Sequence, residues 1–398
     1  MPKIAIIGGG LVALGTGWKL SKSVPNARVL IIEKEAAVGA HQSSHNSGVL
    51  HCGLYYQPGS LKARMAVEGI REMTAFAAEH GIPHEICGKI VVALDAAEEA
   101  RLRELERRGT QNGVRGLQWL GPGEIKEREP HSAGRSALLV PDEGIICFPS
   151  VAAKLADLLR SSGNEVHTGH EVTGLRRSGG SQIVATSRGE FEADFVVNCA
   201  GLQSDRVFAL TGEKPGCRIV PFRGEYFTLK EKARHLVKHL IYPVPDPRFP
   251  FLGVHFTRMI GGGVEAGPTA VLALKREGYR KTDFSLRDTL EALAFPGLLR
   301  FIARYPRHTF REVCHSLSRR VFGNSLRRLI PELSDSDLDP GPAGVRAQAM
   351  TRKGDLVMDF FIEERPGQLH VLNAPSPGAT ASLAIGGYIA GKVAGQLS

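Results

Sequence analysis

Three consecutive glycines, Gly8 to Gly10, are the residues whose type and spacing most directly indicate chemistry in this chain. Glycine lets a backbone turn sharply and approach a bound pyrophosphate closely. A helix that begins at the next residue would point its free amides and its positive end at the phosphate charge. Glu33 follows at the distance, about twenty residues, where a carboxylate can accept hydrogen bonds from ribose hydroxyls. The pattern predicts a dinucleotide site.

The elements that must position this site surround it in the sequence. Ile4–Ile7 and Arg28–Ile32 are apolar, strand-like runs, and a helical pattern starts at residue 11. Ala13 stands where the third glycine of the pattern is expected, and its small side chain allows close packing of helix on strand. These elements alone do not distinguish a flavin from a nicotinamide dinucleotide. The cofactor-binding residues predicted here are Gly8, Gly9, Gly10, Leu11, Val12, Glu33 and Lys34.

A polar, glycine-punctuated loop follows the strand that ends before Glu33. Its hydroxyls and amide can donate hydrogen bonds to phosphate or flavin oxygens. The alternative is ordinary loop capping, in which the same groups bond to nearby backbone. The residues predicted to contact the cofactor from this loop are Ser43, Ser44, Asn46, Ser47 and Gly48.

Length and composition are those of a globular enzyme. The 398 residues exceed the size at which a single core usually stops growing, so we expect two domains. The six cysteines include no Cys-x-x-Cys pair, which argues against zinc, iron–sulfur and disulfide frameworks, and we predict no metal site. The sequence contains no apolar run long enough to span a membrane and no secretory signal. We therefore expect a cytoplasmic protein.

The net charge of +9 comes largely from a basic stretch between Lys275 and Arg328. Its arginines alternate with apolar residues and lack the aromatic-plus-basic pattern of nucleic-acid binding, so we expect no nucleic-acid partner. Within residues 284–330 an apolar face suits a helix lying on anionic lipid at the inner face of the cell membrane. The alternative is a helix that faces the core and exposes a basic side. The apolar residues concerned are Leu290, Leu293, Phe295, Leu298, Leu299 and Ile302.

Strand and helix patterns place the nucleotide domain in three separate pieces of the chain. Residues 1–80 contain the glycine turn and a long helical pattern from Leu61 to His80. Residues 147–218 and 341–398 contain further strand–turn–helix patterns. The insertions 81–146 and 219–340 are predicted to form a substrate domain. The expected fold class is α/β, with a Rossmann-type nucleotide domain and an interleaved mixed-sheet α+β domain.

Five further motifs occur in order along the chain. They are Ser44–Tyr56, Pro221–Tyr226, Phe251–Arg258, Gly344–Gln348 and Asn373–Ser382. With the glycine turn, they make the whole chain resemble the FAD-dependent oxidoreductases of the D-amino-acid oxidase and glycerol-3-phosphate dehydrogenase superfamily. Within that superfamily it most resembles the L-2-hydroxyglutarate oxidases or dehydrogenases. Ala13 and Cys52 are small departures from the family pattern.

The resemblance implies that the dinucleotide is FAD. It adds Val172, Ala200 and Gly201 to the predicted cofactor contacts, and it places a second glycine-rich turn, Gly378, Ala379 and Thr380, beside the isoalloxazine. Amides at the helix start after that turn can stabilise negative charge on the flavin. Some relatives attach flavin covalently through a histidine in a setting similar to that of His45. We expect noncovalent FAD.

His51 is the first candidate for a catalytic base. Oxidation of a 2-hydroxy acid removes a hydroxyl proton while hydride leaves the adjacent carbon for flavin N5, and a neutral imidazole is the usual base near neutral pH. The related glycerol-3-phosphate dehydrogenases carry a histidine at the matching place. His255 is the second candidate, and one of the two could be the base while the other donates a hydrogen bond. A purely structural role is the alternative for both.

A dicarboxylate substrate requires cationic partners, because unpaired charges are costly to bury. Arginine binds a carboxylate through two parallel hydrogen bonds. Arg258 and Arg346 are the predicted clamps and Arg223 is the third candidate, although any one of them could form a structural ion pair. The tyrosines predicted to contribute hydroxyls, or to pack as aromatic rings, are Tyr55, Tyr56 and Tyr226.

The predicted function is FAD-dependent oxidation of L-2-hydroxyglutarate to 2-oxoglutarate, with electrons passed to a quinone or to oxygen. The alternatives on the same scaffold are an amine or amino-acid oxidase and a glycerol-3-phosphate dehydrogenase. A further alternative is an assembly factor that binds FAD without turnover.

Overall fold

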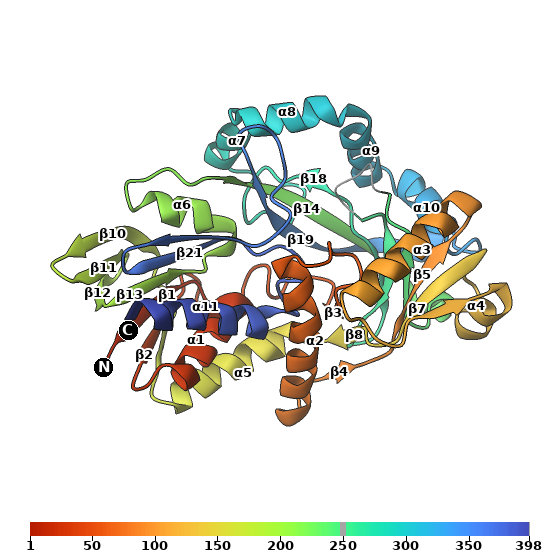
Figure 1. The fold of residues 1–398 in the computed structure, drawn as a ribbon. Helices are drawn as coiled ribbons and strands as arrows, with labels where there is room; N and C mark the ends of the chain where they lie inside the picture. The colour runs from red at the N-terminus through yellow and green to blue at the C-terminus, as the bar shows by residue number, and fades with distance from the viewer. Residues whose placement is uncertain (247–251, 398) are drawn as a thin grey trace.

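The computed structural model describes residues 1–246 and 252–397, and its N-terminal strand lies inside a six-stranded sheet (Figure 1). The strand order is β20-β21-β13-β1-β2-β9, and all neighbours are parallel except β20 and β21. The sheet thus joins strands from three distant parts of the chain. Its strands are β1 (Lys3–Ile7), β2 (Arg28–Ile32), β9 (Glu165–His167), β13 (Phe195–Asn198), β20 (Phe361–Arg365) and β21 (Gln368–Asn373).

Alternate residues of the central strands enter two different cores, as the period of two requires. Ile4 and Ile6 pack with the helices on one face of the sheet, whereas Ala5 and Ile7 pack with a three-stranded sheet on the other. In Figure 1, α1, α5 and α11 lie together below the sheet. The helices are α1 (Leu11–Ser23), α2 (Leu61–Glu79), α5 (Phe148–Ser161) and α11 (Ser382–Leu397), and the small sheet contains β10 (Val172–Ser178), β11 (Ser181–Thr186) and β12 (Gly189–Ala193).

The crossing of α1 and α11 depends on glycine. A Cβ added to Gly15 would lie 2.6 Å from the carbonyl oxygen of Ser382, and one added to Gly386 would lie 2.5 Å from the carbonyl carbon of Gly15. Gly69 of α2 meets Ala381 equally closely, at 2.5 Å. Because no side chain fits between these backbones, the turn that precedes α11 is held against α1 and α2.

A nine-stranded mixed sheet forms the second layer of the molecule. On β5, Ile90 and Val92 pack with an outer core, whereas Val91 and Ala93 pack with the core of the nucleotide-binding part. The face of this sheet that carries Val91 and Ala93 therefore packs against the nucleotide-binding part. The path runs β18 (Val271–Leu272), β14 (Arg218–Leu229), β17 (Val264–Gly267), β16 (His255–Arg258), β15 (Leu240–Pro243), β5 (Lys89–Ala93), β7 (Ser136–Val140) and β6 (Gln118–Leu120), with β19 (Leu338–Met350) paired to β14.

Short elements connect the two layers. A three-stranded sheet is formed by β3 (Val49–Leu50), β8 (Gly144–Ile146) and β4 (His84–Glu85). The remaining helices outside the basic segment are α3 (Ala96–Gln111), α4 (Pro122–Arg128) and α6 (Ser204–Ala209), with 3-10 turns at Gly201–Gln203, Glu231–Leu236 and Asp335–Asp337.

The basic segment 284–330 forms four short helices instead of a single amphipathic one. Pro296 and Pro306 each stand in the first turn of a new helix, where proline is tolerated, and the Ser318 hydroxyl accepts from the Val321 amide at the start of the last. The helices are α7 (Leu286–Leu293), α8 (Pro296–Arg304), α9 (Pro306–Leu317) and α10 (Arg319–Arg327).

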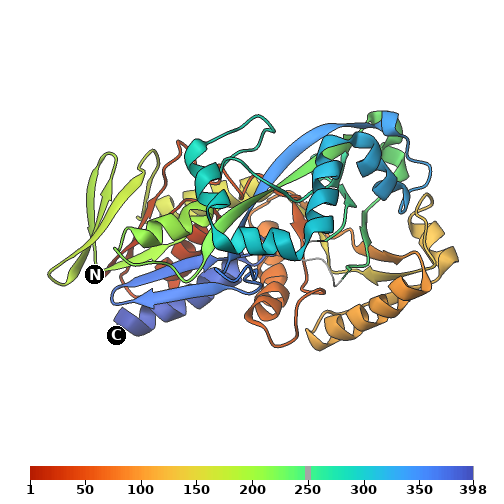
Figure 2. The ribbon, with the colours of Figure 1, turned by 90° about the horizontal axis from the view of Figure 1, so that it is seen from above.

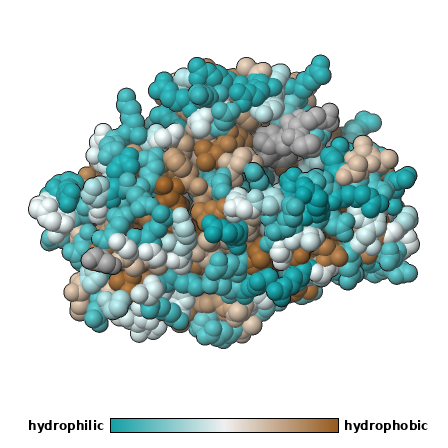
Figure 3. Space-filling model, viewed as in Figure 1, coloured by the Kyte–Doolittle hydropathy of each residue, from teal (hydrophilic) through white to brown (hydrophobic). Residues whose placement is uncertain are grey.

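These helices divide the predicted apolar stripe between two environments. Phe295 and Leu298 are buried, whereas Leu290, Leu293 and Leu299 are exposed. Figure 1 shows α7, α8 and α9 along the upper side of the molecule, which faces the viewer in Figure 2. In the space-filling view the rim over α8 is hydrophilic and hydrophobic side chains appear beneath it (Figure 3). No helix within the described residues combines the length and apolarity needed to cross a bilayer.

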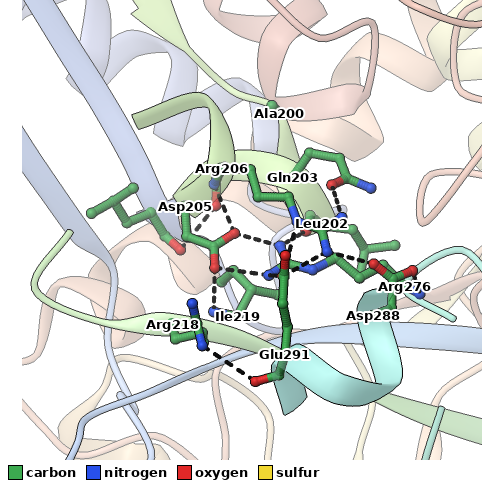
Figure 4. A network of polar contacts seen from close by, with 12 residues as sticks. Ala200, Leu202, Gln203, Asp205, Arg206, Arg218, Ile219, Arg276, Asp288 and Glu291 are labelled. Carbon is green, nitrogen blue, oxygen red and sulfur yellow. Dashed lines mark hydrogen bonds and ion pairs between the residues drawn. The ribbon is translucent and has the colours of Figure 1, made fainter. Parts of the chain in front are cut away.

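A buried ion-pair network fastens these helices to the nucleotide-binding part (Figure 4). Arg276 Nη2 donates to Asp205 Oδ2 at 3.0 Å, and the same carboxylate oxygen accepts from the Ile219 amide at 3.0 Å. Arg206 of α6 pairs with Asp288 at 2.5 Å and with Glu291 at 2.7 Å, both on α7. The network turns the acidic groups of α7 inward.

Candidate active site

The glycine turn forms a cradle that side chains would fill. Gly8 has φ 108°, and a Cβ there would lie 2.6 Å from the carbonyl oxygen of Cys199. A Cβ on Gly9 would lie 2.9 Å from the side chain of Glu33. Gly10 is the N-cap residue of α1, and being glycine it brings no capping side chain there. The N-cap residue therefore adds no side chain at the start of α1, the end of a helix that favours an anion such as pyrophosphate.

Glu33 lies directly beside this turn. Its two carboxylate oxygens accept from the Gly9 amide at 2.6 Å and from the Glu35 amide at 2.8 Å. Next to it, Lys34 Nζ pairs with Glu35 and, at 3.0 Å, with Glu277. Burial acts to lower the pKa of Lys34, but these carboxylates raise it overall. The predicted acceptor for a ribose thus stands at the end of β2.

The loop of residues 43–48 is tied to the same helix start. Ser43 Oγ accepts from the Leu11 amide at 3.0 Å. Ser44 donates to the Gly39 carbonyl at 2.5 Å, and Asn46 donates to the carbonyls of Gln42 and Ser43 at 2.9 Å. Ser44 and Asn46 therefore cap the loop itself, while Ser43 connects it to α1. Their contact with a cofactor, and that of Ser47 and Gly48, stays a prediction.

The remaining predicted cofactor residues lie at the ends of strands. Ala200 and Gly201 follow β13, Val172 begins β10, and Gly378 and Ala379 belong to the turn before α11. Thr380 Oγ1 accepts from the His51 amide at 3.2 Å and lies 3.2 Å from the Val49 carbonyl. The C-terminal turn is thereby joined to the loop that contains His51.

A buried carboxylate meets His51. Glu143 Oε2 lies 3.4 Å from His51 Nδ1 and 2.6 Å from Lys89 Nζ, and both Glu143 and Lys89 are fully buried. The amide of Cys52 donates to Glu143 Oε1 at 3.2 Å. Burial would raise the pKa of Glu143, but Lys89 and His51 hold it well below its usual range. Glu143 is therefore deprotonated and negatively charged near neutral pH.

Two tyrosine rings enclose the ammonium group of Lys89. Its Nζ lies 4.5 Å from the centre of the Tyr55 ring and 4.9 Å from that of Tyr242. A cation over an aromatic face is attracted by the ring quadrupole. Burial raises the pKa of both phenols far above their ordinary value, so both stay neutral.

The His255 ring is stacked on the Tyr242 ring with 3.8 Å between ring centroids. The His51 ring meets the same tyrosine edge-on at 6.5 Å. His255 Nδ1 lies 2.9 Å from the Gly253 carbonyl, which fixes the hydrogen on that nitrogen. Burial is the main cause that lowers the pKa of His255 to about 3. His255 is therefore neutral over the physiological range.

Arg346 and Tyr226 approach this cluster from β19 and β14. Arg346 Nη1 donates to the Thr269 carbonyl at 3.2 Å, and the Arg346 charge acts on both His255 and Tyr226. Burial raises the pKa of Tyr226 to about 12. Tyr56 lies by the C-terminal turn, where burial raises its pKa and a hydrogen bond with Ser376 opposes that rise. The structure therefore brings His51, His255, Arg346 and Tyr226 into one region.

Arg258 and Arg223 are not brought to this cluster. Arg258 follows His255 by three residues on β16, so strand alternation turns it to the opposite face, where it pairs with Glu85 at 2.5 Å. Arg223 pairs with Glu225 at 2.7 Å. Both arginines form ion pairs of the kind expected under the structural alternative, and their contact with substrate stays a prediction.

Sequence reasoning missed Glu143, Lys89 and Tyr242. Lys89 opens an apolar run and Glu143 sits in a turn, and neither position has a pattern that signals function. The charge of Lys89 next to the apolar residues Ile90–Ala93 was the one feature of the sequence that could have indicated a functional role. The contact between Cys52 and Glu143 spans 91 positions of the chain, which local patterns do not encode.

Three groups near the ribose end, Glu35, His41 and Glu277, have atoms within 4.8 Å of one another. Lys34 Nζ lies among them, 3.1 Å from His41 Nε2, and supplies the positive charge that these carboxylates require. The cluster is therefore accounted for by protein groups.

A glycine turn at a helix start, a carboxylate after the second strand and a histidine–carboxylate cluster joined to the same loops define a dinucleotide-dependent oxidoreductase. Residues 3–391 match the family described as FAD dependent oxidoreductase, and the chain belongs to this family.

Curated relatives match along almost the whole chain. The L-2-hydroxyglutarate dehydrogenase of Indibacter alkaliphilus is 47% identical over 388 residues, 97% of either chain. That of Escherichia coli K12 is 44% identical, covering 99% of this chain and 93% of its own. The human mitochondrial L-2-hydroxyglutarate dehydrogenase is 42% identical, with 98% and 88% covered.

Solved structures share the fold. An L-α-glycerophosphate oxidase of Mycoplasma pneumoniae with FAD bound superposes with a TM-score of 0.78 at 21% identity, covering 99% of this chain and 95% of that one. Glycine oxidase of Geobacillus kaustophilus gives 0.74 at 21% identity, with 100% and 95% covered. These likenesses confirm the α/β fold class expected from the sequence.

The residues present fit FAD. A side chain at Gly8 or Gly9 would collide with its neighbours, so only backbone fits at this turn. The turn leads directly into the start of α1. The Glu33 carboxylate lies beside it, where it can accept a hydrogen bond from a ribose hydroxyl. These residues would hold the ADP half of the cofactor.

Proposed function

We propose that this protein oxidises L-2-hydroxyglutarate to 2-oxoglutarate with FAD as its cofactor. Full-length relatives at 42–47% identity that are named for this substrate support the proposal. FAD, when bound, accepts the hydride from the carbon that carries the hydroxyl. The observation that carries the assignment is that His51, whose amide donates to Thr380 of the C-terminal turn, and Arg346 both lie close enough to His255 for their charges to act on it.

His51 is the proposed base. It contacts a carboxylate through Nδ1, which leaves Nε2 free to accept the hydroxyl proton. His255 has a pKa of about 3, so it holds a proton too weakly to serve well near neutral pH. Its Nε2 is suited to accept a hydrogen bond and thereby to orient the substrate.

Arg346 is the proposed partner of a substrate carboxylate. Burial lowers its pKa from the ordinary arginine value, and an arginine is still charged at neutral pH. Tyr226, which stays protonated, can donate to the same carboxylate. Arg258 and Arg223 stay predictions in this role, and their pairing with Glu85 and Glu225 supports a structural one instead.

We propose that FAD is bound noncovalently. His45 is stacked on Tyr279 with 3.8 Å between ring centroids, and its Nδ1 lies 3.0 Å from the His41 carbonyl. Both contacts hold the ring in a structural role. Acid precipitation should leave the yellow colour in the supernatant, whereas a yellow pellet would show a covalent link.

The proposed electron acceptor is a quinone, reached by peripheral contact of the basic helices α7–α10 with an anionic membrane. Segment 284–330 contains nine arginines and three acidic residues. Asp288 and Glu291 pair with Arg206, and Glu312 accepts from the Ala270 amide at 2.8 Å, so all three acids face the protein. Oxygen is the acceptor if the protein does not bind membranes.

Anaerobic mixing with a substrate panel tests the proposed reaction. L-2-hydroxyglutarate should bleach the flavin absorbance, whereas D-2-hydroxyglutarate, glycerol 3-phosphate, glycine and L-proline should not. His51→Gln should retain FAD and slow bleaching by roughly 10²–10⁴-fold, because a positioned base contributes that much. Bleaching by glycine or glycerol 3-phosphate in place of L-2-hydroxyglutarate would contradict the substrate. An unchanged rate in the variant would contradict the base.

A further inference from the structure

A buried charged pair lies beside His51. Lys89 and Glu143 are both 0% exposed, with 2.6 Å between Nζ and Oε2. Desolvation of two charges costs several kcal/mol, so a buried ion pair is weak support for stability. Apolar residues would fill the same space at less cost. Such pairs are expected where a fixed charge serves a neighbouring group.

Each oxygen of Glu143 has its own partners. Oε1 accepts from the Cys52 amide at 3.2 Å and from Cys52 Sγ at 3.3 Å. Oε2 faces Lys89 Nζ at 2.6 Å and His51 Nδ1 at 3.4 Å. The carboxylate is therefore fixed on one side by the backbone next to His51 and on the other by a buried cation. The partners of Glu143 are thus the Cys52 amide, the Cys52 thiol, the Lys89 ammonium and the His51 ring. Among these groups, the His51 ring has a second nitrogen, Nε2, that can take part in the reaction.

Lys89 cannot easily leave Glu143. Its ammonium lies between the faces of Tyr55 and Tyr242, and the Tyr242 ring also stacks on His255. Lys89 therefore holds the Glu143 carboxylate in place. The Tyr242 ring contacts Lys89 and also the rings of His51 and His255.

We propose that Glu143, anchored by Lys89 and the Cys52 amide, is a positioning residue that keeps a hydrogen of His51 on Nδ1 and directs Nε2 to the substrate hydroxyl. The inference rests on the proposed role of His51 as the base. Nε2 takes the hydroxyl proton as the C–H bond breaks and its hydride passes to FAD. The proton stays on the imidazolium, whose charge Glu143 balances without accepting the proton itself.

The distance of 3.4 Å is longer than an aligned hydrogen bond. Catalytic contacts of this kind are often long in the absence of substrate and shorten in the complex. Within the described residues His51 Nδ1 makes no hydrogen bond, so the ring has to move toward the carboxylate for the bond to form.

Several titratable or charged groups face His51 from the elements around it, and any of them could affect its pH dependence. They are Glu143 before β8, Lys89 of β5, Cys52 and Tyr55 of its own loop, Tyr242 of β15, and His255 of β16. Glu143 supplies the negative charge among them, so its removal should leave the positive charge of Lys89 uncompensated.

The variant Glu143→Gln in the FAD-loaded enzyme tests the proposal. We expect flavin bleaching by L-2-hydroxyglutarate to slow by roughly 10²–10⁴-fold, as when a histidine loses its orienting carboxylate. The acidic limb of the kcat/KM profile should move to lower pH, because uncompensated Lys89 disfavours the imidazolium. In a His51→Gln background the same change should cost little further rate, since the two residues act as a unit.

Glu129→Gln is the matched control. Glu129 is also fully buried and contacts a histidine, with 2.8 Å from its Oε1 to His239 Nδ1, but it lies outside the His51 cluster. This variant should lower stability without moving the acidic limb or the bleaching rate. Equal effects of the two variants, or an undiminished effect of Glu143→Gln in the His51→Gln background, would overturn the proposal.

Nitrogen-15 NMR of histidine-labelled protein supplies a readout that does not depend on turnover. The His51 signals, assigned by their loss in His51→Gln, should report the Nδ1–H tautomer and change in Glu143→Gln. An unchanged tautomer would overturn the positioning role. If His51→Gln itself leaves bleaching unaffected, the proposed base is wrong. The NMR measurement of the His51 tautomer then still tests whether Glu143 positions the His51 ring.

Discussion

At the scale of single residues, the proposed contact of Arg346 with a substrate carboxylate can be tested by substitution. Its guanidinium can form two parallel hydrogen bonds with a carboxylate, which the single ammonium of lysine cannot reproduce. Such charge-assisted bonds contribute roughly 1.5–3 kcal/mol, so Arg346→Lys should raise KM for L-2-hydroxyglutarate roughly 10- to 100-fold. Steady-state kinetics with a quinone analogue as acceptor measure this change.

Arg258→Lys is the appropriate comparison, because Arg258 belongs to a family-like motif yet pairs with Glu85 on the other face of β16. Its KM should stay near that of the parent protein. If the two variants changed KM equally, Arg346 would not be the specific clamp.

Single residues could be predicted from the sequence where their own type carries the chemistry. The glycine turn, Glu33, His51 and His255 were predicted in this way, whereas Arg346, like Arg258, was predicted because it lies in a family motif. The structure brings His51, His255 and Arg346 into one region, and their roles stay predictions. Partners that matter only through a long-range contact, such as Glu143 and Lys89, could not be predicted. Arg258 was favoured because its motif is similar to the family's, but the direction of its side chain depends on strand register.

At the scale of elements, the crossing of α1 and α11 connects the glycine turn with the C-terminal turn. Gly386→Ala would place a Cβ 2.5 Å from the carbonyl carbon of Gly15, and backbone cannot yield as a side chain can. Overpacking of this kind costs about 1–3 kcal/mol. We expect a lower melting temperature and weaker FAD retention, because Thr380, which contacts the His51 amide, precedes α11.

Gly391→Ala is the control in the same helix. A Cβ at Gly391 would meet no atom within 4 Å in the described part of the chain, and alanine favours a helix by up to about 1 kcal/mol over glycine. This variant should be as stable as the parent or more so. Destabilisation by both alanines would indicate a general sensitivity of α11 instead of a contact at Gly15.

Elements with strong local patterns were predictable nearly to the residue. The strand expected at Arg28–Ile32 is β2, and the helix expected from Leu61 to His80 is α2, Leu61–Glu79. Segment 284–330 was interpreted as one helix because the apolar spacing from Leu290 to Ile302 continues across Pro296. Pro296 and Pro306 each start a new helix there, so the stripe is divided between core and surface.

At the scale of the whole molecule, exposed apolar side chains gather on the basic helices. Of the thirteen exposed large hydrophobic residues in the described chain, nine lie between Phe284 and Val321, too many to be scattered by chance over the surface. Arginines lie among them, and the acids of the segment face inward. Figures 1 and 2 place α7, α8 and α9 on one side of the molecule, which would allow them to contact a single plane.

Vesicle sedimentation tests whether this surface binds anionic lipid. The FAD-loaded protein should sediment with phosphatidylglycerol vesicles and not with phosphatidylcholine vesicles, and binding should weaken in high salt because exposed charges are screened. The double variant Phe310→Ser and Leu317→Ser removes side chains that are 71% and 78% exposed, and it should reduce binding at least roughly 10-fold through lost apolar burial. Arg307→Ser should reduce binding about 5-fold, since one basic residue near the surface contributes about 1 kcal/mol.

Met358→Ser is the control for loss of an exposed apolar side chain, because Met358 is 57% exposed and lies outside the basic helices. It should leave vesicle binding unchanged. All four proteins should bleach equally fast with L-2-hydroxyglutarate, since none of the changed residues belongs to the His51 cluster, so any loss of quinone reduction on vesicles can be assigned to docking. Equal binding to both lipids, or equal losses for Met358→Ser and the double variant, would show that the basic helices are an ordinary solvated face, and oxygen would then be the proposed acceptor.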